Sequence, residues 1–208
     1  MTLIALSASY GAGGSVVGPR VAQRLGVPFV DRAIPTKVAE QLAVPLSHAL
    51  AHDENIGGVF ERMLKHLAPL SGAYASGAAT EALLGPDLYK EATERVILEL
   101  ADAGKGVILG RACALVLRDR ATVLRVRLDG PPERRMEQGM RIENIERETA
   151  ERRMQETDQA RDAYVRHFYG ADPRDIGHFD LVIDSTAIDL DACVDVIVCA
   201  AEAKASGT

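Results

Sequence analysis

The chain has 208 residues, of which 47% are hydrophobic and 4% aromatic, and it contains no tryptophan. This length and composition predict one large globular domain with an aliphatic core and room for inserted lobes. The formal net charge of −6 argues against general attraction to nucleic acid or to an anionic membrane, so an anionic ligand would need a local cluster of arginines.

We expect neither a membrane span nor an export signal. The apolar segment 2–8 is too short for the hydrophobic region of a signal peptide and lacks a basic start, and no apolar run reaches the length of a membrane span. Cys113, Cys193 and Cys199 lie in apolar sequence without the spacing of a metal site. We therefore expect three buried thiols in a cytoplasmic protein. Nothing in the pattern indicates an oligomeric state.

Short apolar segments alternate with helical patterns along the chain. Strands are expected at 2–8, 27–31, 106–110, 121–130 and 180–186. Helices are expected at 15–26, 33–44, 47–70, 88–104, 132–169 and 189–205, with a Gly- and Ala-rich loop at 71–87. This alternation predicts an α/β domain with a mainly parallel sheet. Segments 33–90 and 131–165 interrupt the alternation and are candidate inserted lobes.

A glycine-rich turn follows the first expected strand. Gly11, Gly13 and Gly14 permit positive φ and let a phosphate approach the backbone, and the start of the next helix adds partial positive charge. The full phosphate-loop pattern is broken twice, because Ala8 stands at its first glycine and Gly14 at its lysine. Ser15 stands at the place of the hydroxyl residue. A turn of this kind can also simply connect a strand to a helix.

Pro19 affects where the first helix can begin. A start at Ser15, with Ser15 as the N-cap, places Pro19 where its missing N–H costs an early intrahelical bond. A start at Gly18 gives Pro19 the favoured first position but makes the loop unusually long. We expect the earlier start, with a distorted first turn.

Three stretches together resemble the cytidylate kinase-like family of P-loop nucleoside monophosphate kinases. They are SASYGAGGSVVGPRVAQRLGVPFVDR, VILGRACALVL and ERRMQETDQARDAYVRHFYGADPRDIGHFDLVIDST, at 7–32, 107–117 and 151–186. The loop of that family typically reads Ser-Arg-x-Tyr-Gly-Ser-Gly-Gly and lacks the lysine of true cytidylate kinases. Five positions match here, and Ala8 replaces the arginine. The resemblance therefore makes the missing lysine a trait of this branch.

The resemblance implies a P-loop fold of five parallel strands flanked by helices. Its core would comprise 1–32, 91–130 and 166–208, with an NMP-binding lobe at 33–90 and an arginine-rich lid at 131–165. The implied cofactors are ATP and Mg²⁺, and the implied partners are small nucleotides. The loop that would hold the ATP phosphates consists of Tyr10, Gly11, Ala12, Gly13, Gly14 and Ser15.

Five further residues match functional positions of the family. Asp31 would lie next to the acceptor nucleotide, and Arg111 would contact the acceptor phosphate. Arg153 and Arg161 would clamp phosphates from the lid, and Asp158 would help to hold the acceptor nucleotide. Two departures, Ala112 and Leu115, remove carboxylates that family members carry near Mg²⁺.

Several of these residues also have ordinary structural interpretations. Asp31 can cap a helix, and Arg111 can form an ion pair after its strand. The lid segment carries acid–base pairs four residues apart, Glu137–Arg141, Glu143–Arg147 and Glu148–Arg152, which are typical of a solvated helix. Arg134, Arg135, Arg141 and Arg147 fit that pattern. His48 and His52 lack a third ligand and are interpreted as exposed histidines, so no metal ligand is assigned.

Together these features predict a kinase that transfers the γ-phosphoryl group of ATP to a nucleoside monophosphate, most simply CMP or dCMP. A kinase of another small acceptor fits the same pattern. A nucleotide-binding regulatory protein with little transferase activity is the alternative, favoured by Gly14, Ala112 and Leu115. The retained lid arginines and Arg111 favour the kinase.

Overall fold

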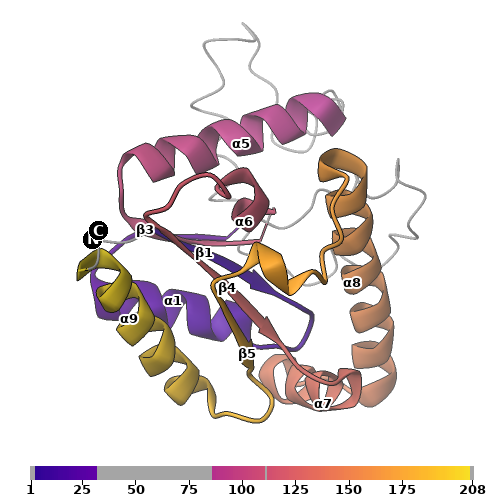
Figure 1. Cartoon of the computed structure of the whole chain (residues 1–208). Coiled ribbons are helices and arrows are strands. Elements are labelled where there is room, and N and C mark those ends of the chain that lie inside the picture. Colours follow the sequence, from indigo (N-terminus) through magenta and orange to yellow (C-terminus); the bar gives the residue numbers. More distant parts are fainter. Residues whose placement is uncertain (1–2, 32–85, 111, 207–208) are drawn as a thin grey trace, which may run out of the picture.

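The computed structural model describes residues 3–31, 86–110 and 112–206. Five strands form one all-parallel sheet in the order β2-β3-β1-β4-β5 (Figure 1). The strands are β1 Leu3–Ala8, β2 Phe29–Asp31, β3 Gly106–Leu109, β4 Val123–Asp129 and β5 Leu181–Asp184. The predicted fold class and all five predicted strands are confirmed.

Helices follow the strands in alternation. They are α1 Gly14–Leu25, α5 Pro86–Asp102, α6 Cys113–Val116, α7 Pro132–Glu143, α8 Arg147–Tyr169 and α9 Leu190–Ser206, with a 3-10 turn η1 at Ile176–His178. The single helical region expected at 132–169 is two helices, because Asn144 adopts a left-handed conformation with φ 51° and ends α7. The helices predicted at 33–44 and 47–70 lie outside the described residues, as do His48 and His52.

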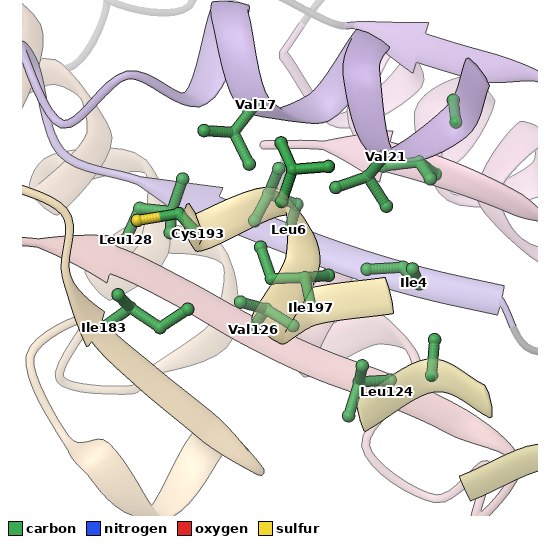
Figure 2. Close-up of a cluster of buried hydrophobic side chains, with 14 of the residues drawn as sticks. Ile4, Leu6, Val17, Val21, Leu124, Val126, Leu128, Ile183, Cys193 and Ile197 are labelled. Carbon is green, nitrogen blue, oxygen red and sulfur yellow. The ribbon is translucent and has the colours of Figure 1, made fainter. Parts of the chain in front are cut away.

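The sheet has a buried face on each side, because alternate residues of β1 point in opposite directions. Ile4 and Leu6 pack on one side against α1 and α9, and Figure 2 shows them together with Val17 of α1 and Ile197 of α9. Leu3 and Ala5 pack on the other side with residues of α5 and α6. Each fully buried Leu, Ile or Val side chain stabilises the fold by about 1.5–3 kcal/mol. This three-layer core holds the sheet edge that carries the site.

The strand register brings the functional segments to one edge. Ala8 at the end of β1 is opposite Leu128 of β4, and Leu109 at the end of β3 is opposite both Leu6 and Asp31. The carboxyl ends of β1, β2, β3 and β4 therefore meet, and ligands of open α/β sheets bind at such an edge.

The first turn of α1 differs from the sequence-based expectation. The N-cap is Gly13, with left-handed φ 76°, and not Ser15, because the helix already begins at Gly14. Val16 and Val17 both donate to the carbonyl oxygen of Gly13, at 3.0 and 2.9 Å. Pro19 lies inside the helix on its exposed side. The earlier helix start is thus confirmed, and the Ser15 cap is wrong.

The three cysteines are free, and Cys113 and Cys193 are buried as expected. Cys199 is exposed, so the expectation for that residue is wrong: it follows the buried Ile197 by two positions, which places it on the outer side of α9. Burial raises the pKa of the Cys113 thiol to about 12. Among the described residues, none of the helices combines the length and the apolar character needed to span a membrane.

Candidate functional site

A cavity of about 1060 Å³ opens at the carboxyl edge of the sheet. It is lined by the glycine loop, the ends of β2, β3 and β4, and parts of α6, α7 and α8. Most of the residues singled out in the sequence line it, namely Tyr10, Gly11, Gly13, Gly14, Ser15, Asp31, Arg153, Asp158 and Arg161.

Two predicted residues do not appear in this lining. Ala12 is fully buried below the loop, where its carbonyl oxygen accepts a hydrogen bond of 2.8 Å from the Ser185 hydroxyl, so it supports the loop from behind. Arg111 lies outside the described residues. Its neighbours Gly110 and Ala112 both line the cavity.

The glycine loop presents unpaired amides to the cavity. Gly11 and Gly13 adopt left-handed conformations, with φ 74° and 76°. In the described part of the chain, the N–H groups of Gly11, Gly13, Gly14 and Ser15 have no acceptor. Successive backbone N–H groups at the start of a helix form an anion-binding concavity. The loop therefore has the form of a phosphate site, although it carries no lysine.

Asp158 of α8 and Arg135 of α7 hold the loop; these two helices lie largely in the segment 131–165 that was predicted to be a lid, and they are called the lid helices after that prediction. The Tyr10 amide donates to Asp158 Oδ1 at 2.9 Å, and Arg135 Nη1 donates to the Tyr10 carbonyl oxygen and to Asp158 Oδ2, both at 2.8 Å. Arg135 is only 7% exposed and also donates to the carbonyl oxygen of Gly130 at 3.0 Å. Gln138 adds a bond of 2.9 Å to the carbonyl oxygen of Gly11. The loop and the lid helices are thus joined by a buried polar network.

The Tyr10 side chain makes a second connection to the lid. Its hydroxyl donates to Glu143 at 3.1 Å, and Glu143 is paired with Arg153. Burial, followed by the Glu143 carboxylate, raises the pKa of Tyr10, so the phenol stays protonated. The ring lies against Gly139, where an added Cβ would come within 2.9 Å of it. Arg153 therefore reaches the cavity already held by Glu143.

Arg161 extends from α8 over the start of the loop. Its Nη1 donates to the carbonyl oxygen of Ala8 at 2.8 Å. The side chain is exposed to the cavity, and desolvation by neighbouring atoms lowers the pKa of Arg161. Asp158 and Asp31 oppose the shift. An arginine nevertheless remains charged, so the group is a cation facing the loop.

Arg127 and Asp129 of β4 were not expected in the site. Arg127 donates twice to Asp129 Oδ2, at 3.0 and 2.7 Å, and also to the hydroxyl of Ser9 and the carbonyl of Pro173. Partial burial alone would raise the pKa of Asp129, but the Arg127 contacts hold it below its usual value. The signal in the sequence was the alternation of β4, whose polar face ends at the sheet edge.

The ion pairs of the lid helices differ from the expected pattern. Among the described residues, the three expected pairs Glu137–Arg141, Glu143–Arg147 and Glu148–Arg152 do not appear as ion pairs. Instead, Arg147 pairs with Glu133, and Arg153 with Glu143, so each bridge joins α8 to α7. The interpretation of Arg135 as a solvated residue is wrong, because α7 turns its side chain toward the loop.

Two buried polar atoms in the cavity have no hydrogen-bond partner among the described residues. They are Oε2 of Glu156 and Nε2 of His178, which lies 4.0 Å from Asp175 Oδ2. Ala112 adds backbone strain at the same wall, since it is a non-glycine residue with φ 53° where the family resemblance places an aspartate. Strain and unpaired polar atoms concentrate at ligand sites.

The model of the cytidylate kinase-like family matches residues 3–187. The chain belongs to the cytidylate kinase-like family. The cytidylate kinase of Methanopyrus kandleri (strain AV19) is 34% identical over 110 residues, covering 49% of this chain and 56% of that protein. The chain thus matches little more than half the length of this curated relative.

Solved structures confirm the fold. An uncharacterized protein from Eubacterium ventriosum ATCC 27560 matches with a TM-score of 0.64 at 18% identity, over 97% of this chain and 99% of that chain. A gluconokinase from Sinorhizobium meliloti 1021 matches with a TM-score of 0.53 at 16% identity, over 99% and 94%. The chain therefore shares its fold, a five-stranded parallel sheet flanked by helices, with these structures.

Proposed function

We propose that this protein is an ATP- and Mg²⁺-dependent kinase that transfers the γ-phosphoryl group to a nucleoside monophosphate, CMP or dCMP. One observation supports the proposal most directly. The unpaired amides of the loop and the guanidinium of Arg161 line the same cavity. Family membership and the similarity to a cytidylate kinase support the choice of acceptor.

In the proposed reaction, the amides of Gly11 and of Gly13 to Ser15 bind the donor phosphates. An oxygen of the acceptor phosphate attacks the γ-phosphorus as the bond to the β,γ-bridging oxygen breaks, and ADP leaves with that electron pair. The attacking oxygen is already anionic, so the protein needs no general base. Arg153 and Arg161 neutralise the charge that spreads over the transferred group.

The cavity also fits a magnesium ion brought in with ATP. Ser15 in the first turn of α1 and Asp31 at the end of β2 both line it, and an alcohol and a carboxylate are oxygen ligands of the kind Mg²⁺ prefers. When bound, the ion would neutralise charge on the β- and γ-phosphates. Mg²⁺ commonly takes only one or two protein ligands, so Ala112 and Leu115 do not exclude it.

A second hollow of about 400 Å³ adjoins the loop. It is lined by Gln138, Arg141 and Ile142 of α7 and by residues 186–190. Leu190 from this hollow packs against Gly13, where an added Cβ would lie 2.7 Å from Leu190 Cδ2. We assign the nucleoside part of ATP to this hollow, because it adjoins the amides that would hold the phosphates.

One observation favours the alternative, a nucleotide-binding regulatory protein with weak transfer activity. Both carboxylate oxygens of Asp158 are engaged by the loop and Arg135, which leaves this residue less free to hold an acceptor. A kinase of a different small acceptor would share the same phosphate site and differ only in the acceptor.

The decisive experiment follows ADP formation with Mg·ATP and a panel of nucleoside monophosphates and small alcohols. Turnover fastest with CMP or dCMP supports the proposal. Arg161→Ala should lower kcat by about 10³-fold or more, as loss of an arginine at a transferring phosphoryl group does elsewhere. Arg166→Ala is the matched control, since Arg166 is an exposed residue of the same helix outside the cavity lining. Tight Mg·ATP binding without turnover on any acceptor would favour the regulatory protein.

A further inference from the structure

The loop fills the space that a side chain at position 14 would need. A Cβ built on Gly14 would lie 2.6 Å from Cβ of Ala8 and 3.2 Å from Cδ1 of Leu109. The Ala8 methyl group cannot rotate away, and its backbone is fixed in β1 opposite Leu128. Only glycine therefore fits at position 14 while Ala8 is present, and a lysine is excluded by steric overlap.

This contact joins the two departures from the phosphate-loop pattern. Ala8 stands where the pattern has its first glycine, and Gly14 stands where it has lysine. The Ala8 methyl group lies so close that a Cβ at position 14 would overlap it. The two positions therefore form one coupled pair, in which a side chain fits at position 8 or at position 14 but not at both.

A cation from a different part of the chain contacts the start of the loop. Arg161 of α8 donates to the carbonyl oxygen of Ala8, the residue whose methyl group excludes a lysine. Its guanidinium thus lies over the start of the loop and lines the same cavity as the unpaired amides. Arg127 and Arg135 also approach the loop, but their hydrogen bonds go to other protein groups. Arg127 donates to Asp129, Ser9 and Pro173, and Arg135 donates to Gly130, Tyr10 and Asp158.

We propose that Arg161 supplies the phosphate-facing cation that the loop lacks, and that the Ala8–Gly14 contact keeps the loop from supplying its own. The inference rests on the proposed function and adds the origin of the charge. Because Arg161 belongs to α8, the affinity for the nucleotide depends on where α8 lies relative to the loop. In a loop with its own lysine, that charge would be present regardless of α8.

The test measures binding of Mg·ADP by titration calorimetry, with thermal unfolding as the control for folding. Arg161→Ala should weaken binding about 10- to 100-fold, as expected for loss of a charge-assisted hydrogen bond. Gly14→Lys should lower Tm and binding, whereas Ala8→Gly/Gly14→Lys should fold and bind. Adding Arg161→Ala to that double variant should then cost only a few-fold, because the new lysine supplies the charge.

Four results would overturn the inference. Gly14→Lys with wild-type Tm and affinity would remove the steric coupling. Wild-type affinity of Arg161→Ala for Mg·ADP would show that Arg161 is not the phosphate-facing cation. An equal loss of affinity from Arg161→Ala in the wild type and in the Ala8→Gly/Gly14→Lys double variant would show the same. A wild-type protein that binds no Mg·ADP would end both the inference and the proposed function. Binding without transfer to any monophosphate would end the proposed function alone, and the variant comparison would still decide the inference.

Discussion

Replacing Asp158 by alanine tests whether the loop is held by the lid. The change removes the acceptor of the Tyr10 amide and one partner of Arg135, which is 7% exposed. Breaking a buried ion pair costs about 3–5 kcal/mol, because the remaining charge stays buried. Here Asp129 remains 3.4 Å from Arg135 Nε, and two carbonyl oxygens still accept from the guanidinium. We therefore expect a loss of about 2–3 kcal/mol in the free energy of unfolding.

The measurement is urea unfolding followed by circular dichroism at neutral pH, with the slope checked for two-state behaviour. Asp162→Ala is the matched control on the same helix. Asp162 pairs with the exposed Arg166 and Arg174 at 3.9 and 3.3 Å, so its loss should cost less than about 0.5 kcal/mol. Equal losses in the two variants would refute the buried network.

A double-mutant cycle separates the pair from its surroundings. Arg135→Met alone leaves Asp158 without its cation, and the double variant removes both charges. The combined loss should be smaller than the sum of the single losses by about 1–3 kcal/mol, because each single variant strands one partner. Additive losses would show that Arg135 acts through its carbonyl contacts and Asp129, and not through Asp158.

Three further predictions concern the loop, acid stability and the thiols. Gly11→Ala should lower the free energy of unfolding in urea far more than Gly26→Ala. Both glycines have positive φ, but only a Cβ at position 11 would lie 1.9 Å from the Arg135 carbonyl oxygen. Equal losses in the two variants would contradict this prediction. Partial burial would raise the pKa of Asp180, but hydrogen bonds from Arg125 and Lys204 hold it well below its usual range. The contacts of the Asp180 carboxylate therefore stabilise the fold above about pH 4, and this stability is lost as the pH falls further. Asp180→Asn should remove that part of the pH dependence of unfolding. An aromatic disulfide reagent should modify Cys199 rapidly in the native protein, and it should modify Cys113 and Cys193 only on unfolding. Fast reaction of all three thiols would disprove the burial of Cys113 and Cys193.

The strands and the glycine loop were predictable because their signals are local. Apolar runs bounded by glycines, as at 106–110, identify buried strands without knowledge of their neighbours. In β4, the apolar residues Leu124, Val126 and Leu128 alternate with polar ones, a pattern that by itself identifies the side facing the core. The N-cap of α1 was harder to predict. Gly13 caps the helix through its left-handed backbone, whereas Ser15 only resembled a cap in sequence.

The polar network was not predictable, because it depends on contacts between segments far apart in the chain. Arg135 resembled its neighbours in a charged helix, and its sequence separation from Tyr10 is 125 residues. Helical spacing alone pairs it with residues of its own helix. Only the packing of α7 against the loop, with Gly139 beneath the Tyr10 ring, turns Arg135 inward.

Asp158 shows how a matched motif can carry a different contact. The resemblance assigns it to the acceptor nucleotide, whereas here its two oxygens accept from the loop and from Arg135. Arg161, three residues further along α8, donates to the other end of the same loop. One helix thus holds the loop at Ala8 and at Tyr10, on both sides of Ser9. In the proposed kinase, a movement of α8 away from the loop would break these contacts to Ala8 and Tyr10, and it would thereby couple acceptor exchange to binding of the donor nucleotide.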